Sequence, residues 1–111
     1  MTIIVEKVWG HEEWLENNDL YCVKLLYVRQ GFRCSLHYHP IKDETFFLKS
    51  GRILLEYGVP LAAVEMVEGS HVRLLPGTTH RFTGLEDSVI VEAGTPHDDR
   101  DVVRLTQSGK L

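Results

Sequence analysis

Turn-forming residues interrupt this sequence at intervals of roughly 8–12 residues, and this spacing is the feature that most constrains its fold. The interruptions include Gln30-Gly31, Ser50-Gly51, Glu68-Gly69, Pro76-Gly77 and Gly94-Thr95-Pro96. The runs between them are rich in β-branched and aromatic residues, which favour strands. No segment keeps a helical apolar period over three turns. Many short strands with this spacing predict a small antiparallel barrel or sandwich.

The individual strand predictions follow from the runs between the turns. Strands are expected at 20–29, 32–39, 45–48, 52–57, 71–75 and 88–93. Residues 59–67 come nearest to a helical period, but they fit a strand equally well. A chain of 111 residues has room for one core, so residues 1–111 are expected to form a single domain. The barrel is assigned to 6–105, and the polar tail 106–111 is expected to be frayed.

The net charge indicates which ligands the protein can bind, and the two cysteines are considered together with its expected compartment. The net charge of -4 argues against nucleic acid, which needs a basic excess, but leaves room for a small anionic ligand. No apolar run approaches the length of a membrane helix, and no signal peptide is visible at the start. A cytoplasmic protein is expected, with Cys22 and Cys34 reduced.

A His-x-His pair followed by a carboxylate is the most informative local pattern. His37 and His39 are two apart, so in a strand their side chains point to the same face. Pro40 helps to end that strand, and Glu44 opens the next one, where it can meet the two imidazoles across a hairpin. Such a set leaves open coordination positions for a divalent metal.

A second cluster supplies one more histidine. The Pro76-Gly77 turn reverses the chain just before His80. A histidine placed there can reach the same metal from an adjacent strand, which would give three histidines and one glutamate.

These two clusters resemble the two sequence motifs of the cupin superfamily. Residues 31–51 fit the first motif, Gly-x5-His-x-His-x4-Glu-x6-Gly, at every fixed position. Residues 69–80 resemble the second, Gly-x5-Pro-x-Gly-x2-His, with Leu75 in place of its first proline. The resemblance implies an all-β double-stranded β-helix, or jelly-roll barrel, with a short extended N-terminal segment. It also implies a metal bound by His37, His39, Glu44 and His80, with zinc, manganese, iron or nickel as the ion.

A narrower resemblance connects the chain with the cupin domain of type II mannose-6-phosphate isomerases. The residues that carry it are Lys7-Val8-Trp9-Gly10, Val23-Lys24, Ser35-Leu36, His39, Glu44-Thr45-Phe46 and Asp99-Arg100-Asp101-Val102-Val103-Arg104-Leu105. This family usually has glutamine where His37 stands. D-lyxose isomerases and other small sugar-directed cupins are similar too. The resemblance implies interconversion of an aldose and a ketose, with a sugar or sugar phosphate as the ligand.

Two residues near the motifs are expected to contact that ligand. Arg33 shares the parity of His37 and could hold a carboxylate or phosphate, although a rim salt bridge explains it equally well. Phe46 shares the face of Glu44 and is expected to line the pocket, with plain core packing as the alternative. No general base is assigned, and the positional possibilities are Glu56, Tyr27, Tyr57 and Lys42.

The remaining distinctive residues have ordinary explanations. His11 and His97 are expected to be solvated or to support the ligands, His71 to lie on the surface, and Cys34 to pack as a small apolar residue. Trp9 and Trp14 are expected to be core or subunit-interface anchors.

The sequence therefore predicts a metal-dependent enzyme that isomerises a sugar or sugar phosphate. A metal-dependent dioxygenase and a non-catalytic sugar-binding protein are the alternatives. Because one small chain cannot cover both faces of every strand, a homodimer is also expected.

Overall fold

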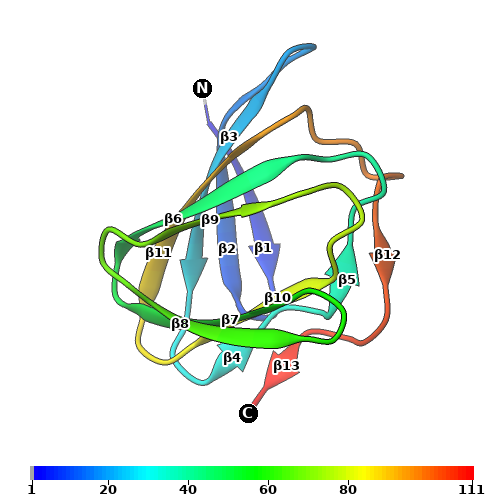
Figure 1. Ribbon diagram of the computed structural model, residues 1–111. Helices are drawn as coiled ribbons and strands as arrows, with labels where there is room; N and C mark the ends of the chain where they lie inside the picture. The colour runs from blue at the N-terminus through cyan, green and yellow to red at the C-terminus, as the bar shows by residue number, and fades with distance from the viewer. Residues whose placement is uncertain (1) are drawn as a thin grey trace.

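Two antiparallel β-sheets form a barrel in the computed structural model of this protein, which describes residues 2–111 (Figure 1). No helix occurs within these residues, so none could span a membrane. The strands are β1 (Ile3–Lys7), β2 (Gly10–Asn17), β3 (Cys22–Val28), β4 (Phe32–Arg33), β5 (His37–Tyr38), β6 (Glu44–Ser50), β7 (Arg52–Tyr57), β8 (Ala62–Val67), β9 (His71–Leu74), β10 (His80–Gly84), β11 (Ser88–Gly94), β12 (Val103–Arg104) and β13 (Gly109–Lys110). The predicted all-β jelly-roll class is confirmed.

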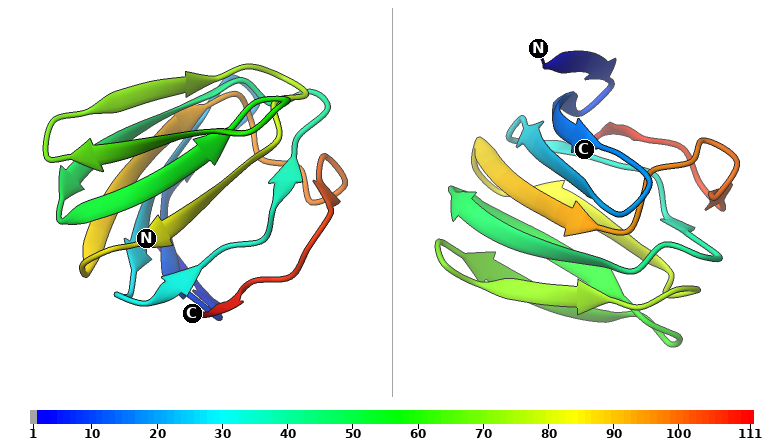
Figure 2. Two further views of the ribbon diagram at one scale, coloured as in Figure 1. Left: turned by 60° about the horizontal axis from the view of Figure 1, so that its bottom comes forward. Right: turned by 90° about the horizontal axis from the view of Figure 1, so that it is seen from above.

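The strand order places the strands that carry His37 and His80 in one sheet and the strand that carries Glu92 in the other. The first sheet has the order β1-β2-β3-β11-β6-β9, and the second contains β12-β5-β10-β4-β13, with β7 between β10 and β8. Figure 2 shows the two layers from two further directions. The core between the sheets includes the fully buried Leu48, Ile53, Leu55, Met66 and Ile90.

The inward-facing rows of three neighbouring strands change from apolar to polar toward the same end of the barrel. Along β3 the buried positions alternate, with Lys24 followed by Leu26 and Val28. In β11 Ile90 precedes Glu92, and in β6 Glu44 precedes Phe46 and Leu48. Glu92 pairs with Lys24 in β3, and Glu44 lies one inward position beyond Phe46, the partner of Glu92 in β6, so these polar residues gather toward one end of the barrel.

The N-terminal segment forms a hairpin that widens the first sheet. Strands β1 and β2 pair from Ile3 with Trp14 to Lys7 with Gly10. A Cβ atom at Gly10, where φ is +150°, would lie 1.8 Å from the carbonyl oxygen of Tyr27, so only glycine fits there. The preceding Trp9 is buried in the core, with its ring 5.0 Å from that of Phe82 in an edge-on contact.

Two sequence predictions differ from the structure. The strand expected over 32–39 is broken, because residues 34–36 leave the ladder between β4 and β5. The tail 106–111 is not frayed: β13 pairs with β4, and the Leu111 N–H donates to the Gly31 carbonyl at 2.7 Å. In the structure, the first strand starts at Ile3 and the last ends at Lys110.

The C-terminal segment is also tied to the start of the histidine strand. The Leu36 N–H donates to Thr106 Oγ1 at 2.9 Å. Replacing Thr106 by valine removes this acceptor, and the free energy of unfolding is expected to fall by about 1 kcal/mol. The Thr106→Ser variant keeps the hydroxyl and should stay near the parent value. Urea unfolding of both variants measures the difference, and equal stability of Thr106→Val and Thr106→Ser would show that the tail is not docked in this way.

Candidate metal centre

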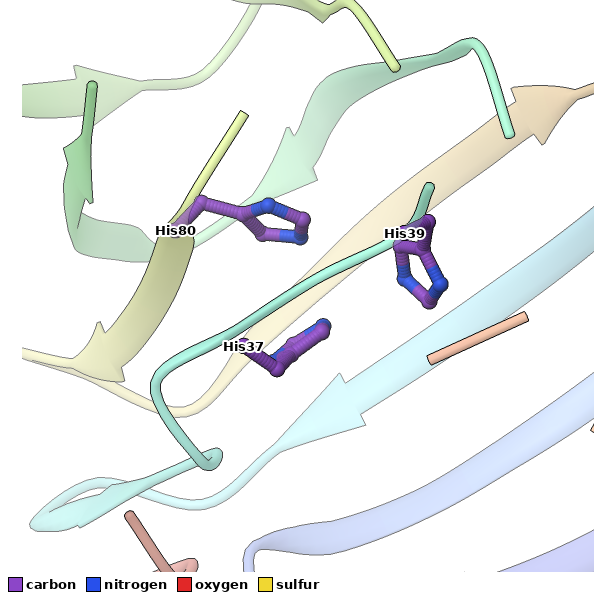
Figure 3. Close-up of side chains that lie close together, drawn as sticks. All are labelled: His37, His39 and His80. Atoms are coloured by element: carbon purple, nitrogen blue, oxygen red, sulfur yellow. The ribbon is translucent and has the colours of Figure 1, made fainter. Parts of the chain in front are cut away.

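Three histidines from two strands and the turn after β5 converge at the polar end of the barrel (Figure 3). His37 in β5 and His80 at the start of β10 are paired across the second sheet, and His39 follows β5. One ring nitrogen from each histidine lies within 4.8 Å of the other two. The two-residue spacing of His37 and His39 thus brings both rings to one side, as the sequence predicts.

Backbone carbonyl groups fix the orientation of all three rings. The Nδ1 atoms of His37, His39 and His80 lie 2.7 Å, 2.6 Å and 2.9 Å from the carbonyl oxygens of Ser35, Asp101 and Thr78. A carbonyl oxygen only accepts, so each Nδ1 carries a hydrogen and donates it. The lone pair of each neutral imidazole is therefore on Nε2, the arrangement typical of histidines that bind metal ions.

Glu44 lies beside the histidines at the start of β6. Its Oε2 atom is 3.4 Å from His39 Nε2, and the residue is 2% exposed. A Cβ atom at Gly94, the partner of Glu44 in β11, would lie only 2.9 Å from the Glu44 Cβ. The glycine at position 94 therefore allows the neighbouring strand to pass close to Glu44.

Burial gives the histidines and Glu44 unusual proton affinities. It lowers the pKa of His37 and of His80 to about 4, with help at His37 from the nearby His80. The pKa of His39 is lowered by the same cause. Burial raises the pKa of Glu44, and the charge of Glu92 raises it further. The three imidazoles are therefore neutral at pH 7, which is the form that binds metal ions.

Two buried atoms at this centre have no hydrogen-bond partner among the described residues. They are Glu44 Oε2 and His80 Nε2. Buried polar atoms are normally paired, so an unpaired acceptor from each of two neighbouring residues indicates a missing partner. Imidazole nitrogens and a carboxylate oxygen suit a divalent transition metal, and these residues fit such an ion.

Solved structures of remote sequence share this fold and help to identify it. The sequence matches no protein-family model and no curated protein. CapF, a capsular polysaccharide assembling protein from Staphylococcus aureus, has a TM-score of 0.79 at 19% identity over 96% of this chain and 34% of its own. Oxalate decarboxylase from Bacillus subtilis has a TM-score of 0.81 at 13% identity over 94% and 30%. KdgF from Halomonas sp. has a TM-score of 0.74 at 16% identity over 81% and 82%.

All three are cupin-fold proteins. This chain has a cupin fold. It spans about a third of the CapF and oxalate decarboxylase chains and most of the KdgF chain. The superfamily resemblance of its two motifs is therefore confirmed at the level of the fold.

The barrel holds a cavity of about 640 Å³ whose lining includes His37, His39 and Glu44. Phe46 lines it, with its ring 5.8 Å from that of His80 in an edge-on contact. Arg33 is not among the lining residues, because the chain leaves the strand conformation after it and parity is not kept as far as His37. Of the residues considered as a base, Lys42 lines the cavity, whereas Tyr27, Glu56 and Tyr57 do not.

A buried cluster of charges next to the histidines was missed by the sequence reasoning. Glu92 forms an ion pair with Lys42 and lies 3.9 Å from Lys24, while Glu12 approaches Lys24 at 3.7 Å. Burial disfavours the charge of Glu92, but the two lysines outweigh it and lower the pKa of this carboxyl. The available signal was a lysine and a glutamate at inward positions of alternating strands.

Asp101 is a second residue that was not predicted to act at the site. Its carbonyl oxygen holds the ring of His39, and its carboxylate accepts from the N–H groups of Ile41 and Lys42 at 2.8 Å and 2.9 Å. One aspartate thus fixes both a ring and the turn that leads to Glu44.

The other distinctive residues lie outside the histidine cluster. His71 is exposed, His11 stacks on Tyr27, and Cys34 is buried in the core. His97 is half-buried on the cavity wall, where it contacts Lys24 and Trp14.

The lowered pKa values predict how the metal-free protein responds to acid. In the Glu44→Gln variant, the free energy of unfolding should fall as the pH is lowered from about 6.5 to about 4. Unfolded histidines bind protons near pH 6.5, whereas folded His37 and His80 resist protonation down to about 4, so the unfolded state gains stability in this window. Glu44 is replaced because its raised pKa acts in the opposite direction.

Urea unfolding at several pH values measures this slope. Adding His37→Asn to the Glu44→Gln variant should make the decline shallower. Adding His71→Asn, at an exposed histidine, should leave it unchanged. An equal slope with and without His37 would contradict the prediction.

Proposed function

We propose that this chain is a metal-dependent cupin that isomerises a small sugar or sugar phosphate between its aldose and ketose forms. The observation that carries the metal site is the set of three histidines whose Nδ1 atoms donate to backbone carbonyls. Glu44, with its unpaired buried Oε2, completes the ligand set. Mn(II) centres are named for the oxalate decarboxylase of similar fold, which supports a divalent ion.

The proposed chemistry divides between the ion and the protein. A divalent ion held by His37, His39, Glu44 and His80 would polarise the carbonyl and hydroxyl oxygens of the open-chain sugar. The backbone carbonyls keep the imidazoles oriented, and Phe46 closes the inner wall of the cavity. Isomerisation also needs a group that moves a proton between adjacent carbons. Lys42 lines the cavity, but the ion pair with Glu92 raises its pKa and keeps it protonated, so no base is assigned.

The carbohydrate part of the proposal rests on the motifs and on one structural relative. The resemblance to type II mannose-6-phosphate isomerases is carried by residues that now lie around the site, including Lys24 and Arg104. CapF is described as a capsular polysaccharide assembling protein, which supports a carbohydrate ligand. A homodimer in the cytoplasm remains part of the proposal, and the exposed Ile3 and Ile4 on the edge strand β1 suit a subunit contact.

Elemental analysis of the purified protein tests the metal site. About one divalent ion per chain is expected for the parent, and the His37→Ala/His39→Ala double variant should lose it because two of four ligands are absent. The His71→Ala variant, which changes an exposed histidine, should keep the parent content. Metal retained at the same stoichiometry in the double variant would refute the assignment.

Turnover assays separate the isomerase from the two alternatives. The metal-loaded protein should interconvert at least one aldose–ketose pair from a panel of sugars and sugar phosphates, with or without oxygen. The Glu44→Gln variant should lose at least tenfold in kcat/KM while keeping its fold, since a metal ligand is weakened. Oxygen uptake coupled to substrate loss would favour the dioxygenase, and binding without turnover would favour a sugar-binding protein.

A further inference from the structure

A polar wall faces the histidines from the opposite side of the same cavity. It consists of Glu12 and Trp14 on β2, Lys24 on β3, and His97 and Asp99 on the loop after β11, and all five line the cavity. We call these residues the Lys24 wall. None of them belongs to the two motifs, and none is needed to hold the proposed metal.

Lys24 has hydrogen-bonding capacity that the described residues do not use. Its side chain is 3% exposed, and its Nζ atom lies 2.8 Å from His97 Nδ1. The carboxylates of Glu12 and Glu92 are 3.7 Å and 3.9 Å away, beyond ordinary hydrogen-bond distance. An ammonium group has three hydrogens. One donates to His97 and the Trp14 ring lies 4.4 Å from Nζ, which leaves at least one hydrogen for an oxygen atom of a ligand in the cavity.

A chain of hydrogen bonds holds Lys24 in this position. An ammonium group only donates, so His97 Nδ1 accepts from Lys24 and the hydrogen of the neutral ring is on Nε2. That atom donates to Asp99 Oδ1 at 2.6 Å, which lowers the pKa of the carboxyl. The His97 N–H donates to Asn17 Oδ1 at 2.9 Å, so the loop itself is anchored to β2. His97 and Asp99 are therefore positioning residues for Lys24.

The charges around the cavity decide which ligand this wall accepts. The lining residues include the four cations Lys7, Lys24, Lys42 and Arg104, and the six acids Glu6, Glu12, Glu44, Glu92, Asp98 and Asp99. Acids exceed cations by two, so a bound divalent ion would bring the formal charge of the lining to about zero. Lys24 and Lys42 each lie beside the buried carboxylate of Glu92, which compensates their charge. Lys7 and the exposed Arg104 form no ion pair among the described residues, but they lie outside the Lys24 wall. Arg33, the basic residue of the first motif region that was expected to hold a carboxylate or phosphate, lies outside the lining.

Neutral hydroxyl groups suit this wall better than a phosphate. Each sugar hydroxyl both donates and accepts, so neighbouring hydroxyls match an ammonium donor next to a carboxylate acceptor. A phosphate dianion would instead approach Glu12, Glu92 and Asp99 and be repelled.

We propose that the Lys24 wall binds the hydroxyl groups of an unphosphorylated sugar while its carbonyl end lies at the histidine centre. This inference rests on the proposed function, which left open a sugar or a sugar phosphate. Hydrogen bonds from Lys24 Nζ and to the Glu12 carboxylate would select the neutral ligand.

Calorimetric titration of the metal-loaded protein with matched pairs tests the proposal, for example mannose with mannose 6-phosphate and fructose with fructose 6-phosphate. At least one free sugar should bind about tenfold more tightly than its phosphate. The Lys24→Met variant should weaken binding of the free sugar by about tenfold, the effect of one charged hydrogen bond. The Glu12→Gln variant keeps the size of the side chain and an acceptor for Trp14, and should weaken the free sugar while narrowing the preference over the phosphate. Lys49→Met, at an exposed lysine outside the cavity, is the control and should match the parent.

The outcomes separate this inference from the proposed function. Tighter or equal binding of the phosphates would overturn the inference, as would parent-like affinity in both Lys24→Met and Glu12→Gln. Binding of neither member of any pair would also overturn it, although metal content at parent level would leave the histidine centre intact. If elemental analysis finds no metal, the proposed function fails, and the same titrations on the metal-free protein still decide the sugar preference.

Discussion

The ion pairs of Glu92 with Lys42 and Lys24 are the interactions on which the polar end of the barrel depends. A carboxylate buried between two sheets is costly unless it is paired, and two lysines from different segments pair it here. Burial and the charge of the same glutamate both raise the pKa of Glu44, the carboxyl that faces the histidines. Loss of Glu92 would leave two buried ammonium groups without their shared partner.

The same charged residues explain why the barrel interior is packed at one end and holds a cavity at the other. Strands β3, β11 and β6 each carry buried apolar residues along one part of their inward row. Toward the end of the barrel that holds the histidines, the inward residues are charged. The apolar part packs as the core, whereas the charged part cannot pack closely and leaves a cavity. The histidines approach this cavity from the second sheet, whereas Glu44 and the strands of the Lys24 wall belong to the first.

Sequence reasoning predicted the histidines and Glu44 because short-range spacing determines where they point. The His-x-His pair needs only strand geometry, and the Pro76-Gly77 turn places His80 at the start of a strand. Arg33 was placed by the same parity rule and lies outside the cavity, because the ladder is interrupted at residues 34–36. Glu12, Lys24, Glu92 and His97 meet only after β2, β3 and β11 are paired, and no local pattern reports such pairing.

The separation of the histidines along the chain has a consequence for folding. His37 and His80 become neighbours only when β5 and β10 pair, and His39 is oriented only when Asp101 has docked. An ion bound by these histidines and Glu44 would act as a reversible cross-link between residues 37–44 and His80. The free energy of unfolding would rise with the logarithm of the free ion concentration, so the barrel would be most stable where the ion is abundant.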